Sequence, residues 1–192
     1  MKKENVEGNE HKVNDFILGF AGSLRKGSYN RALLRKAIEI NPTPYPIISF
    51  ELNVIPLYDD DMAKDGAPQA VKAFREKIKD SRGILIASPE YNYSITGVLK
   101  NAIDWASTVV LGNVLEGKPV AIMGASTSRF GTARSQLALR GVLHAARAQV
   151  LLKPELMIAR AANAFDVDGD LINEKAVSVL SSLLTAFIDI LN

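Results

Sequence analysis

The sequence predicts a doubly wound α/β fold, in which a five-stranded parallel sheet carries helices on both faces. Short apolar runs alternate along the chain with segments whose apolar residues recur every three or four positions, which is typical of strands alternating with helices. The run Gly83–Ala87 is apolar throughout and indicates a strand buried on both faces. A chain of 192 residues suits one domain, so we expect a single domain over residues 15–192 behind a polar tail over residues 1–14.

The first half of the chain supplies two strands and two helices. Apolar residues recur at helical spacing behind the first apolar run, and Pro42, Pro44 and Pro46 end that helix, because proline lacks the N–H group that a helix interior needs. Pro68 suits the first turn of the next helix. In order, we expect a strand at 16–20, a helix at 29–40, a strand at 47–50, a polar loop at 56–66 and a helix at 68–81.

The second half repeats the alternation and closes with a long helix. Gly117, Lys118 and Pro119 mark a turn before the fourth strand, and Asp168 and Gly169 mark the turn of a hairpin. In order, we expect a strand at 83–87, a helix that carries Val98 to Trp105, a strand at 120–123, a helix at 133–146, a strand at 149–152, a hairpin at 164–172 and an amphipathic helix at 174–191.

The composition excludes several classes of protein. The chain has no cysteine, which removes disulfides, thiolate metal sites and thiol nucleophiles, so redox chemistry requires a bound organic cofactor. A net charge of +2 is too small for an extended nucleic-acid surface. No apolar run approaches the roughly 18 residues of a membrane span. The charged N-terminus lacks the apolar centre of a signal peptide, so we expect a cytoplasmic protein without nucleic-acid or membrane partners.

The loop after the first strand reads GSLRKGSYNR, at residues 22–31, and leads straight into a helix. Helix N-termini offer free N–H groups and the positive end of the helix dipole, and therefore bind anions. Ser23, Ser28 and Asn30 add polar side chains and Arg25 adds a cation, which together suit one terminal phosphate. The loop lacks both the P-loop and the GxGxxG patterns. The alternative is an ordinary turn in which Ser28 caps the helix and Arg25 is solvated.

The loop after the third strand mixes a proline, two tyrosines, Asn92 and a carboxylate within the segment SPEYNYS. Such a loop suits the edge of a flat conjugated ring, which needs backbone N–H groups and aromatic surface. The alternative is a polar loop that merely leads into a helix. In either case we expect the helix residues Leu99, Ile103 and Trp105 to pack in the core.

Both segments resemble the NADPH-dependent FMN reductases, a flavodoxin-like family that includes chromate, quinone and azo-dye reductases. The similarity extends over nearly the whole chain. Its most specific elements are GSLRKGS with Asn30 behind it, and PEYNYS and LKNAIDW after the third strand. The resemblance implies a flavodoxin-like fold, bound FMN, and NADPH or NADH as co-substrate.

Carried over by position, the resemblance also implies which residues contact FMN. The phosphate contacts fall on Ser23, Arg25, Ser28 and Asn30, the flavin-ring contacts on Pro89, Glu90, Tyr91 and Asn92, and further contacts on Ala125 and Ser126 after the fourth strand. Phe130, Gly131 and Arg134 lie where such enzymes vary, so the relatives do not fix the substrate.

We expect neither a catalytic acid or base nor a metal site. The hydride chemistry belongs to FMN, so the protein positions the ring and tunes it. The two histidines lack a metal-binding spacing. The aspartates from Asp166 to Asp170 lack the glycine and glutamate of a calcium loop, and the run from Asp59 to Asp61 is expected to be a solvated acidic loop.

The predicted function is therefore an FMN-dependent NAD(P)H oxidoreductase that passes electrons to a small molecule: a quinone, an azo compound, chromate or free flavin. One alternative is a non-enzymatic flavodoxin-type carrier of electrons. Such carriers are typically strongly acidic, whereas this chain has a net charge of +2. A receiver-type signalling domain needs an acidic pocket after the first strand, where Phe20, Ala21 and Gly22 stand.

We also expect a homodimer or a homotetramer with flavin sites near the interface. The expectation rests partly on the resemblance and partly on the apolar helix that carries Val98 to Trp105. Trp105 and residues 109–111 are the predicted contacts.

Overall fold

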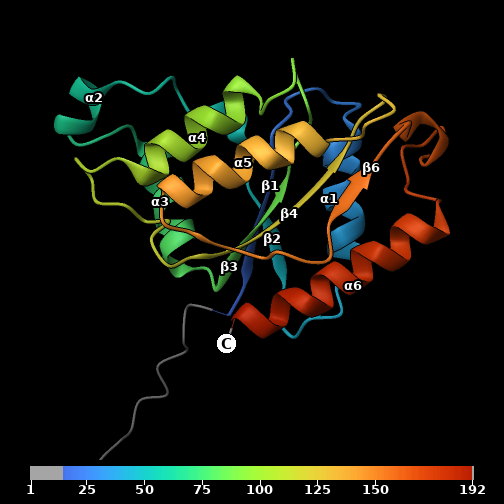
Figure 1. The fold of residues 1–192 in the computed structure, drawn as a ribbon. Coiled ribbons are helices and arrows are strands. Elements are labelled where there is room, and N and C mark those ends of the chain that lie inside the picture. Colours follow the sequence, from blue (N-terminus) through green and yellow to red (C-terminus); the bar gives the residue numbers. More distant parts are fainter. Residues whose placement is uncertain (1–14, 192) are drawn as a thin grey trace, which may run out of the picture.

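A computed structural model describes residues 15–191, which form a parallel sheet between two layers of helices (Figure 1). The strand order is β2-β1-β3-β4-β5, with β6 pairing to β4, and every pair is parallel. The strands are β1 (Ile17–Ala21), β2 (Ile47–Ser49), β3 (Gly83–Ala87), β4 (Pro119–Ala125), β5 (Gln149–Val150) and β6 (Leu156–Ile158). The predicted doubly wound fold is confirmed, while the predicted tail at 1–14 lies outside the described residues.

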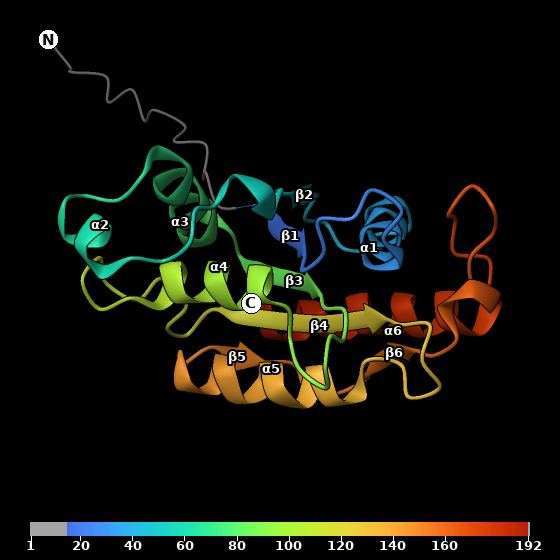
Figure 2. The same ribbon diagram turned by 90° about the horizontal axis from the view of Figure 1, so that it is seen from above.

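Two groups of helices cover the two faces of the sheet. The helices are α1 (Tyr29–Glu39), α2 (Asp60–Lys64), α3 (Gln69–Asp80), α4 (Gly97–Ser107), α5 (Ala133–Ala145) and α6 (Glu174–Leu191). Side chains of α1 and α6 share one hydrophobic cluster with the sheet, and those of α3, α4 and α5 share the other. Viewed from above, α3 and α4 lie on one side of the strands, and α1 and α6 on the opposite side (Figure 2).

The last part of the sheet differs from the prediction. β5 has two residues rather than four, and β6 makes a sixth strand that the sequence did not indicate. Both strands pair with the same edge of β4. β5 pairs with the first residues of β4, from Pro119, and β6 pairs with the last residues of β4, up to Ala125. A three-residue strand is too short to show a period of two in the sequence, and its existence depends on its partner strand.

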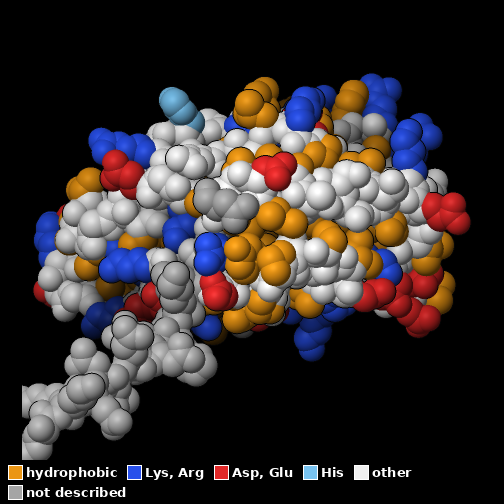
Figure 3. Space-filling model, turned by 90° about the horizontal axis from the view of Figure 1, so that it is seen from below, with side chains coloured by type: hydrophobic (Ala, Val, Ile, Leu, Met, Phe, Trp, Pro, Cys, Tyr) orange, Lys and Arg blue, Asp and Glu red, His pale blue; other side chains and the backbone are white. Residues whose placement is uncertain are grey.

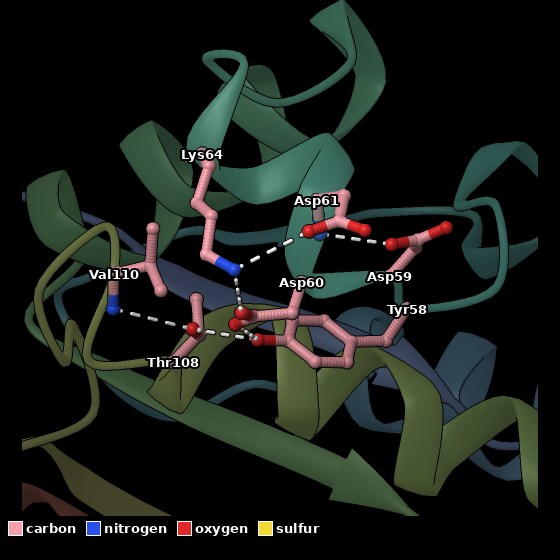
Figure 4. Close-up of polar contacts among 7 residues, drawn as sticks. All are labelled: Tyr58, Asp59, Asp60, Asp61, Lys64, Thr108 and Val110. Carbon is pink, nitrogen blue, oxygen red and sulfur yellow. Dashed lines mark hydrogen bonds and ion pairs between the residues drawn. The ribbon is translucent and has the colours of Figure 1, made fainter.

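The predicted polar loop at 56–66 contains the short helix α2. The Asp59 carboxylate accepts a hydrogen bond from the N–H of Asp61 at 2.9 Å, as an N-cap does. Lys64, one turn later, pairs with Asp60 at 2.7 Å and with Asp61 at 3.3 Å (Figure 4). The hydrogen bond from Lys64 lowers the pKa of Asp60. These local pairs make the acidic run a helix start rather than an unstructured loop.

Tyr58 fastens this segment to α4. Its hydroxyl lies 2.9 Å from that of Thr108 and donates to Asp60 at 3.1 Å (Figure 4). Its ring meets Trp105 edge to face at 4.9 Å, and the Trp105 indole donates to the carbonyl of Pro56 at 2.9 Å. Trp105 is fully buried within the chain. The prediction that it lies in a subunit interface is therefore wrong.

The end of the chain follows the prediction. Phe165 and Leu171 form an antiparallel bridge around Gly169, whose φ of 84° suits the hairpin turn. α6 spans the predicted residues and is uncharged between Lys175 and Asp189. The underside of the molecule, toward which α6 lies, shows mostly uncharged and hydrophobic side chains at its centre and charged ones toward its edges (Figure 3). Within residues 15–191, no helix is both long enough and apolar enough to cross a membrane.

Candidate functional site

The loops after β1, β3 and β4 meet at the carboxyl ends of the strands and line one cleft of about 180 Å³. The strand order reverses between β1 and β3, and doubly wound sheets bind ligands at such a reversal. The lining residues are Ser23, Arg25, Ser28, Tyr29, Asn30, Pro89, Glu90, Tyr91, Ala125, Ser126 and Thr127. Every predicted site residue except Asn92 therefore lines this cleft, and Asn92 lines an adjoining hollow.

Unpaired hydrogen-bond donors gather in the loop after β1. Within residues 15–191, no hydrogen bond uses the backbone N–H groups of residues 23–27 or the hydroxyl of Ser23, although Ser23 is buried. Arg25 is exposed and has no acidic partner among those residues; its guanidinium lies 5.9 Å from the ring centre of Tyr29. Free N–H groups, a hydroxyl and an unpaired guanidinium beside the start of a helix favour an anionic ligand over an ordinary turn.

Ser28 and Asn30 build the site rather than simply line it. The Ser28 hydroxyl accepts hydrogen bonds from the N–H groups of Asn30 at 3.3 Å and Arg31 at 3.5 Å, so it caps α1 and keeps its own hydrogen for another acceptor. The Asn30 amide donates to the carbonyl of Ala125 at 2.8 Å and accepts from the N–H of Ala125 at 2.9 Å. Asn30 thus joins the start of α1 to the end of β4.

Two glycines let the three loops approach one another closely. A Cβ atom on Gly22 would lie 3.1 Å from Pro89 and from Leu99, and one on Gly124 would collide with the carbonyl oxygen of Ser88 and with Thr132. The Gly22 carbonyl accepts a hydrogen bond of 2.7 Å from Thr96, whose oxygen also caps α4. A larger side chain at either glycine would push the loops apart.

Glu90 points its carboxylate at the start of α5. One oxygen accepts from the N–H groups of Arg134 at 2.9 Å and Ser135 at 3.1 Å, and the other lies 3.4 Å from the Arg134 guanidinium. The hydroxyl of Ser135 donates to the carbonyl of Pro89 at 2.7 Å. These bonds hold the loop after β3 in place, while within residues 15–191 the N–H groups of Glu90 and Asn92 keep their hydrogens free for a ligand.

A tight turn forms the tip of the same loop. Tyr91 and Ser94 exchange two backbone hydrogen bonds of 3.0 Å, and the residues between them, Asn92 and Tyr93, have φ values of 49° and 66°. Such a turn favours asparagine or glycine at both central positions, so Tyr93 occupies a strained backbone conformation. The hydrogen-bonded turn thus sets the position of Tyr93 at the tip of the loop.

The loop after β4 has few free backbone donors. The N–H of Ala125 is used by Asn30, and that of Ser126 donates to the carbonyl of Ile158 at 2.9 Å. The Ser126 hydroxyl accepts from the N–H of Ser128 and keeps its hydrogen free. The N–H of Ala125 is therefore not available to a ligand, and its predicted contact is limited to van der Waals contact. Thr127 also lines the cleft, beside Ser126.

Several residues of the site were not predicted from the sequence. Tyr29 lines the cleft, while Thr96 and Ser135 hold its loops. A hydroxyl that bonds to a distant carbonyl looks like any other serine or threonine along the chain. No cluster of residues with metal-ligating side chains occurs in the part of the chain that the structure describes.

The chain is similar to known flavoenzymes over most of its length. The family model for NADPH-dependent FMN reductases matches residues 16–163. An NAD(P)H-dependent FMN reductase of Pseudomonas aeruginosa is 49% identical over 170 residues, which cover 88% of this chain and 91% of that relative. A quinone reductase of Escherichia coli (strain K12) is 40% identical over 179 residues, covering 89% and 92%.

Solved structures agree with this similarity. FerB, a flavoenzyme NAD(P)H:(acceptor) oxidoreductase from Paracoccus denitrificans, has a TM-score of 0.84 and 32% identity, covering 92% of this chain and 97% of that one. An FMN-dependent NADH-azoreductase from Bacillus anthracis, in complex with FMN, has a TM-score of 0.59 at 13% identity, covering 92% and 98%, and so shares the fold. The chain thus belongs to the family of NADPH-dependent FMN reductases, as an oxidoreductase of flavodoxin-like fold that depends on FMN and NAD(P)H.

Proposed function

We propose that this chain carries electrons from NAD(P)H through FMN, bound in the cleft, to quinones. The convergence of the three loops supports the proposal most directly. It brings the hydrogen-bond donors of the loop after β1, which suit an anion, into one cleft with the free N–H groups of the loop after β3. Membership of an enzyme family decides against the alternative of a non-enzymatic carrier.

The donors of the loop after β1 fit the phosphate of FMN. In this proposal the phosphate accepts hydrogen bonds from Ser23, Ser28 and the N–H groups of residues 23–27, and Arg25 supplies the compensating charge. The side chain of Asn30 acts indirectly, because both ends of its amide are held by Ala125. Its contribution is to keep the phosphate loop and the loop after β4 at a fixed separation.

The remaining loops fit the flavin ring. The N–H groups of Glu90 and Asn92, the side chains of Pro89 and Tyr91 and the hydroxyl of Ser126 line these spaces and would hold the ring. FMN, when bound, accepts hydride from the nicotinamide and passes electrons on, so none of these residues needs to act as an acid or base. The chain would bind and orient the ring, and both substrates would react at it in turn.

The relatives support quinones as acceptors. The relative from Escherichia coli is named a quinone reductase, and an NAD(P)H:quinone oxidoreductase of Solanum tuberosum is 42% identical over 176 residues, covering 88% of this chain and 89% of that relative. Azo compounds, chromate and free flavin remain predictions. Turnover of the purified, FMN-saturated protein should be compared with a quinone, an azo compound, chromate and free flavin as acceptors.

Steady-state kinetics with NADPH and benzoquinone test the proposal. We expect sustained turnover and parallel double-reciprocal lines, because donor and acceptor use the same open face of the ring in succession. A flavin absorption spectrum without turnover would instead show an FMN-binding protein that is not a quinone reductase. Intersecting lines would show that the two substrates bind together.

Affinity for FMN and riboflavin tests the phosphate cradle separately. We expect FMN to bind more tightly, and Arg25→Ala to weaken FMN binding by about 1.5 to 3 kcal/mol, because a hydrogen bond to a charged group is lost. Riboflavin binding should not change. Arg35→Ala is the matched control, since Arg35 lies on α1 outside the cleft. Equal affinity of the wild type for FMN and riboflavin would disprove the cradle.

We further propose a cytoplasmic homodimer or homotetramer. Val109 is 89% exposed and its neighbour Val110 is 40% exposed, so the segment presents adjacent apolar side chains that a partner subunit could cover. The segment at 109–111 thus remains a predicted contact. Light scattering should give a multiple of the 20.9 kDa chain mass, and a monomer at working concentration would contradict the proposal. Cell fractionation tests the location.

A further inference from the structure

A hollow of about 550 Å³ adjoins the proposed FMN cleft on the side of α5. Glu90 and Ser126 line both spaces, so a ligand in one can extend into the other. The other lining residues are Asn92, Tyr93, Ser128, Arg129, Phe130 and Arg134. The hollow therefore combines two guanidinium groups with two aromatic rings.

These four side chains form a continuous stack. The guanidinium of Arg134 lies 4.2 Å from the ring centre of Tyr93 and 4.3 Å from that of Phe130. The guanidinium of Arg129 lies 4.6 Å from the ring centre of Phe130. Stacking occupies the faces of a guanidinium and leaves the N–H groups at its edge for other partners. The order along the stack is Tyr93, Arg134, Phe130, Arg129.

Most of those N–H groups have no partner in the described chain. Arg134 makes one long contact of 3.4 Å with Glu90, whose other oxygen is held by the start of α5. Within residues 15–191, Arg129 makes neither a hydrogen bond nor an ion pair. The hollow thus offers positive charge and fixed donors to a ligand that carries negative charge.

The turn at Asn92 and Tyr93 helps to build this arrangement. Tyr93 has a positive φ, which costs free energy, yet the residue is 70% exposed, so burial of its side chain does not compensate that cost. Its principal ring contact is the guanidinium of Arg134. Strain that positions a side chain in this way is typical of a binding site.

We propose that Arg129 and Arg134 bind the phosphate groups of NAD(P)H while its nicotinamide lies over the flavin. This inference rests on the proposed function, because it takes the FMN cleft as the place where hydride is transferred. A dinucleotide carries two or three phosphates some distance from its reactive ring, which matches two cations in a hollow that adjoins the cleft. A quinone is small and carries no anionic group, so it gains less than a dinucleotide from two guanidinium groups.

Equilibrium binding of NADP⁺ to the FMN-loaded protein tests the inference without turnover. We expect Arg129→Gln and Arg134→Gln each to weaken NADP⁺ binding about tenfold to hundredfold, the range for a lost charge-assisted hydrogen bond. Binding by the wild type should also weaken with salt more steeply than binding by either variant. Arg147→Gln is the control, since Arg147 is exposed, pairs with Glu116 and lies outside the hollow.

A phosphate-free donor separates this inference from the proposed function. N-benzyl-1,4-dihydronicotinamide should reduce the flavin of the wild type and of Arg129→Gln at equal rates, while NADPH at low concentration reduces both variants more slowly. The KM for benzoquinone should not change. Equal losses of Arg129→Gln with both donors, or unchanged NADP⁺ binding by the variants, would overturn the inference. If neither donor reduced the flavin of the wild type, the proposed function would be refuted. The NADP⁺ binding measurements would still decide the role of the two arginines.

Discussion

Asn30→Ala tests whether one buried amide holds the two sides of the cleft together. Asn30 bonds to both the N–H and the carbonyl of Ala125, at 2.9 and 2.8 Å, and both residues are buried. The substitution leaves these two backbone groups without partners. Each unsatisfied buried polar group costs about 1 to 3 kcal/mol, so for the two groups we expect the free energy of unfolding to fall by about 2 to 6 kcal/mol. That is a large part of the usual stability of a domain.

Urea unfolding of the FMN-free protein measures this loss. The midpoint should fall while the slope against urea stays constant, because the surface exposed on unfolding is unchanged. FMN binding, measured by quenching of flavin fluorescence, should weaken about tenfold, equivalent to about 1.4 kcal/mol, since the loops on either side of the cleft are no longer tied.

Asn101→Ala is a matched control for this prediction. Asn101 also bridges two backbone groups, accepting from the N–H of Tyr58 at 2.7 Å and donating to the carbonyl of Pro56 at 2.8 Å, but it lies outside the FMN cleft. We expect it to lower stability with little effect on FMN affinity. The reasoning fails if Asn30→Ala leaves the unfolding free energy within about 0.5 kcal/mol of the wild type, or if both variants weaken FMN binding equally.

Three further predictions concern the loops and the pH dependence of stability. Gly124→Ala should cost about 1 to 3 kcal/mol, because its methyl group would collide with a main-chain carbonyl, whereas Gly141→Ala on open helix surface should be neutral or stabilising; thermal unfolding compares them. Glu90→Gln should lower stability by about 0.3 to 1 kcal/mol, since charge is lost at the start of α5, and stopped-flow should show flavin reduction slowed but not abolished. The hydrogen bond from Lys153 lowers the pKa of Glu155 below its usual 4.5. The stabilisation that ionised Glu155 contributes is therefore present above pH 4.5 and is lost as the pH falls through the lowered pKa. The stability difference between wild type and Glu155→Gln should therefore shrink in acid, and a difference that grows there would contradict this sign.

Local patterns along the chain were sufficient for most of the fold. The apolar run Gly83–Ala87 and the helical period of α6 identify their elements without any partner, because burial on both faces or on one stripe leaves its period in the sequence. The loop after β1 was also recognisable, since glycine, serine and arginine before a helix have local reasons to bind an anion, whereas the loop after β3 was identified mainly by its resemblance to a known family.

Contacts between distant residues decided the rest, and a linear pattern does not record them. β6 exists because the end of β4 offers it an edge, and Trp105 is buried because the segment at Pro56 folds over it. Asn30 was identified as a ligand contact, yet its amide is held by Ala125, which is 95 residues away. The stack on Arg134 likewise needs a turn, a loop and a helix start to meet. Side-chain type and spacing follow from the chain, whereas the partner that each polar atom finds depends on how the whole sheet brings its loops together.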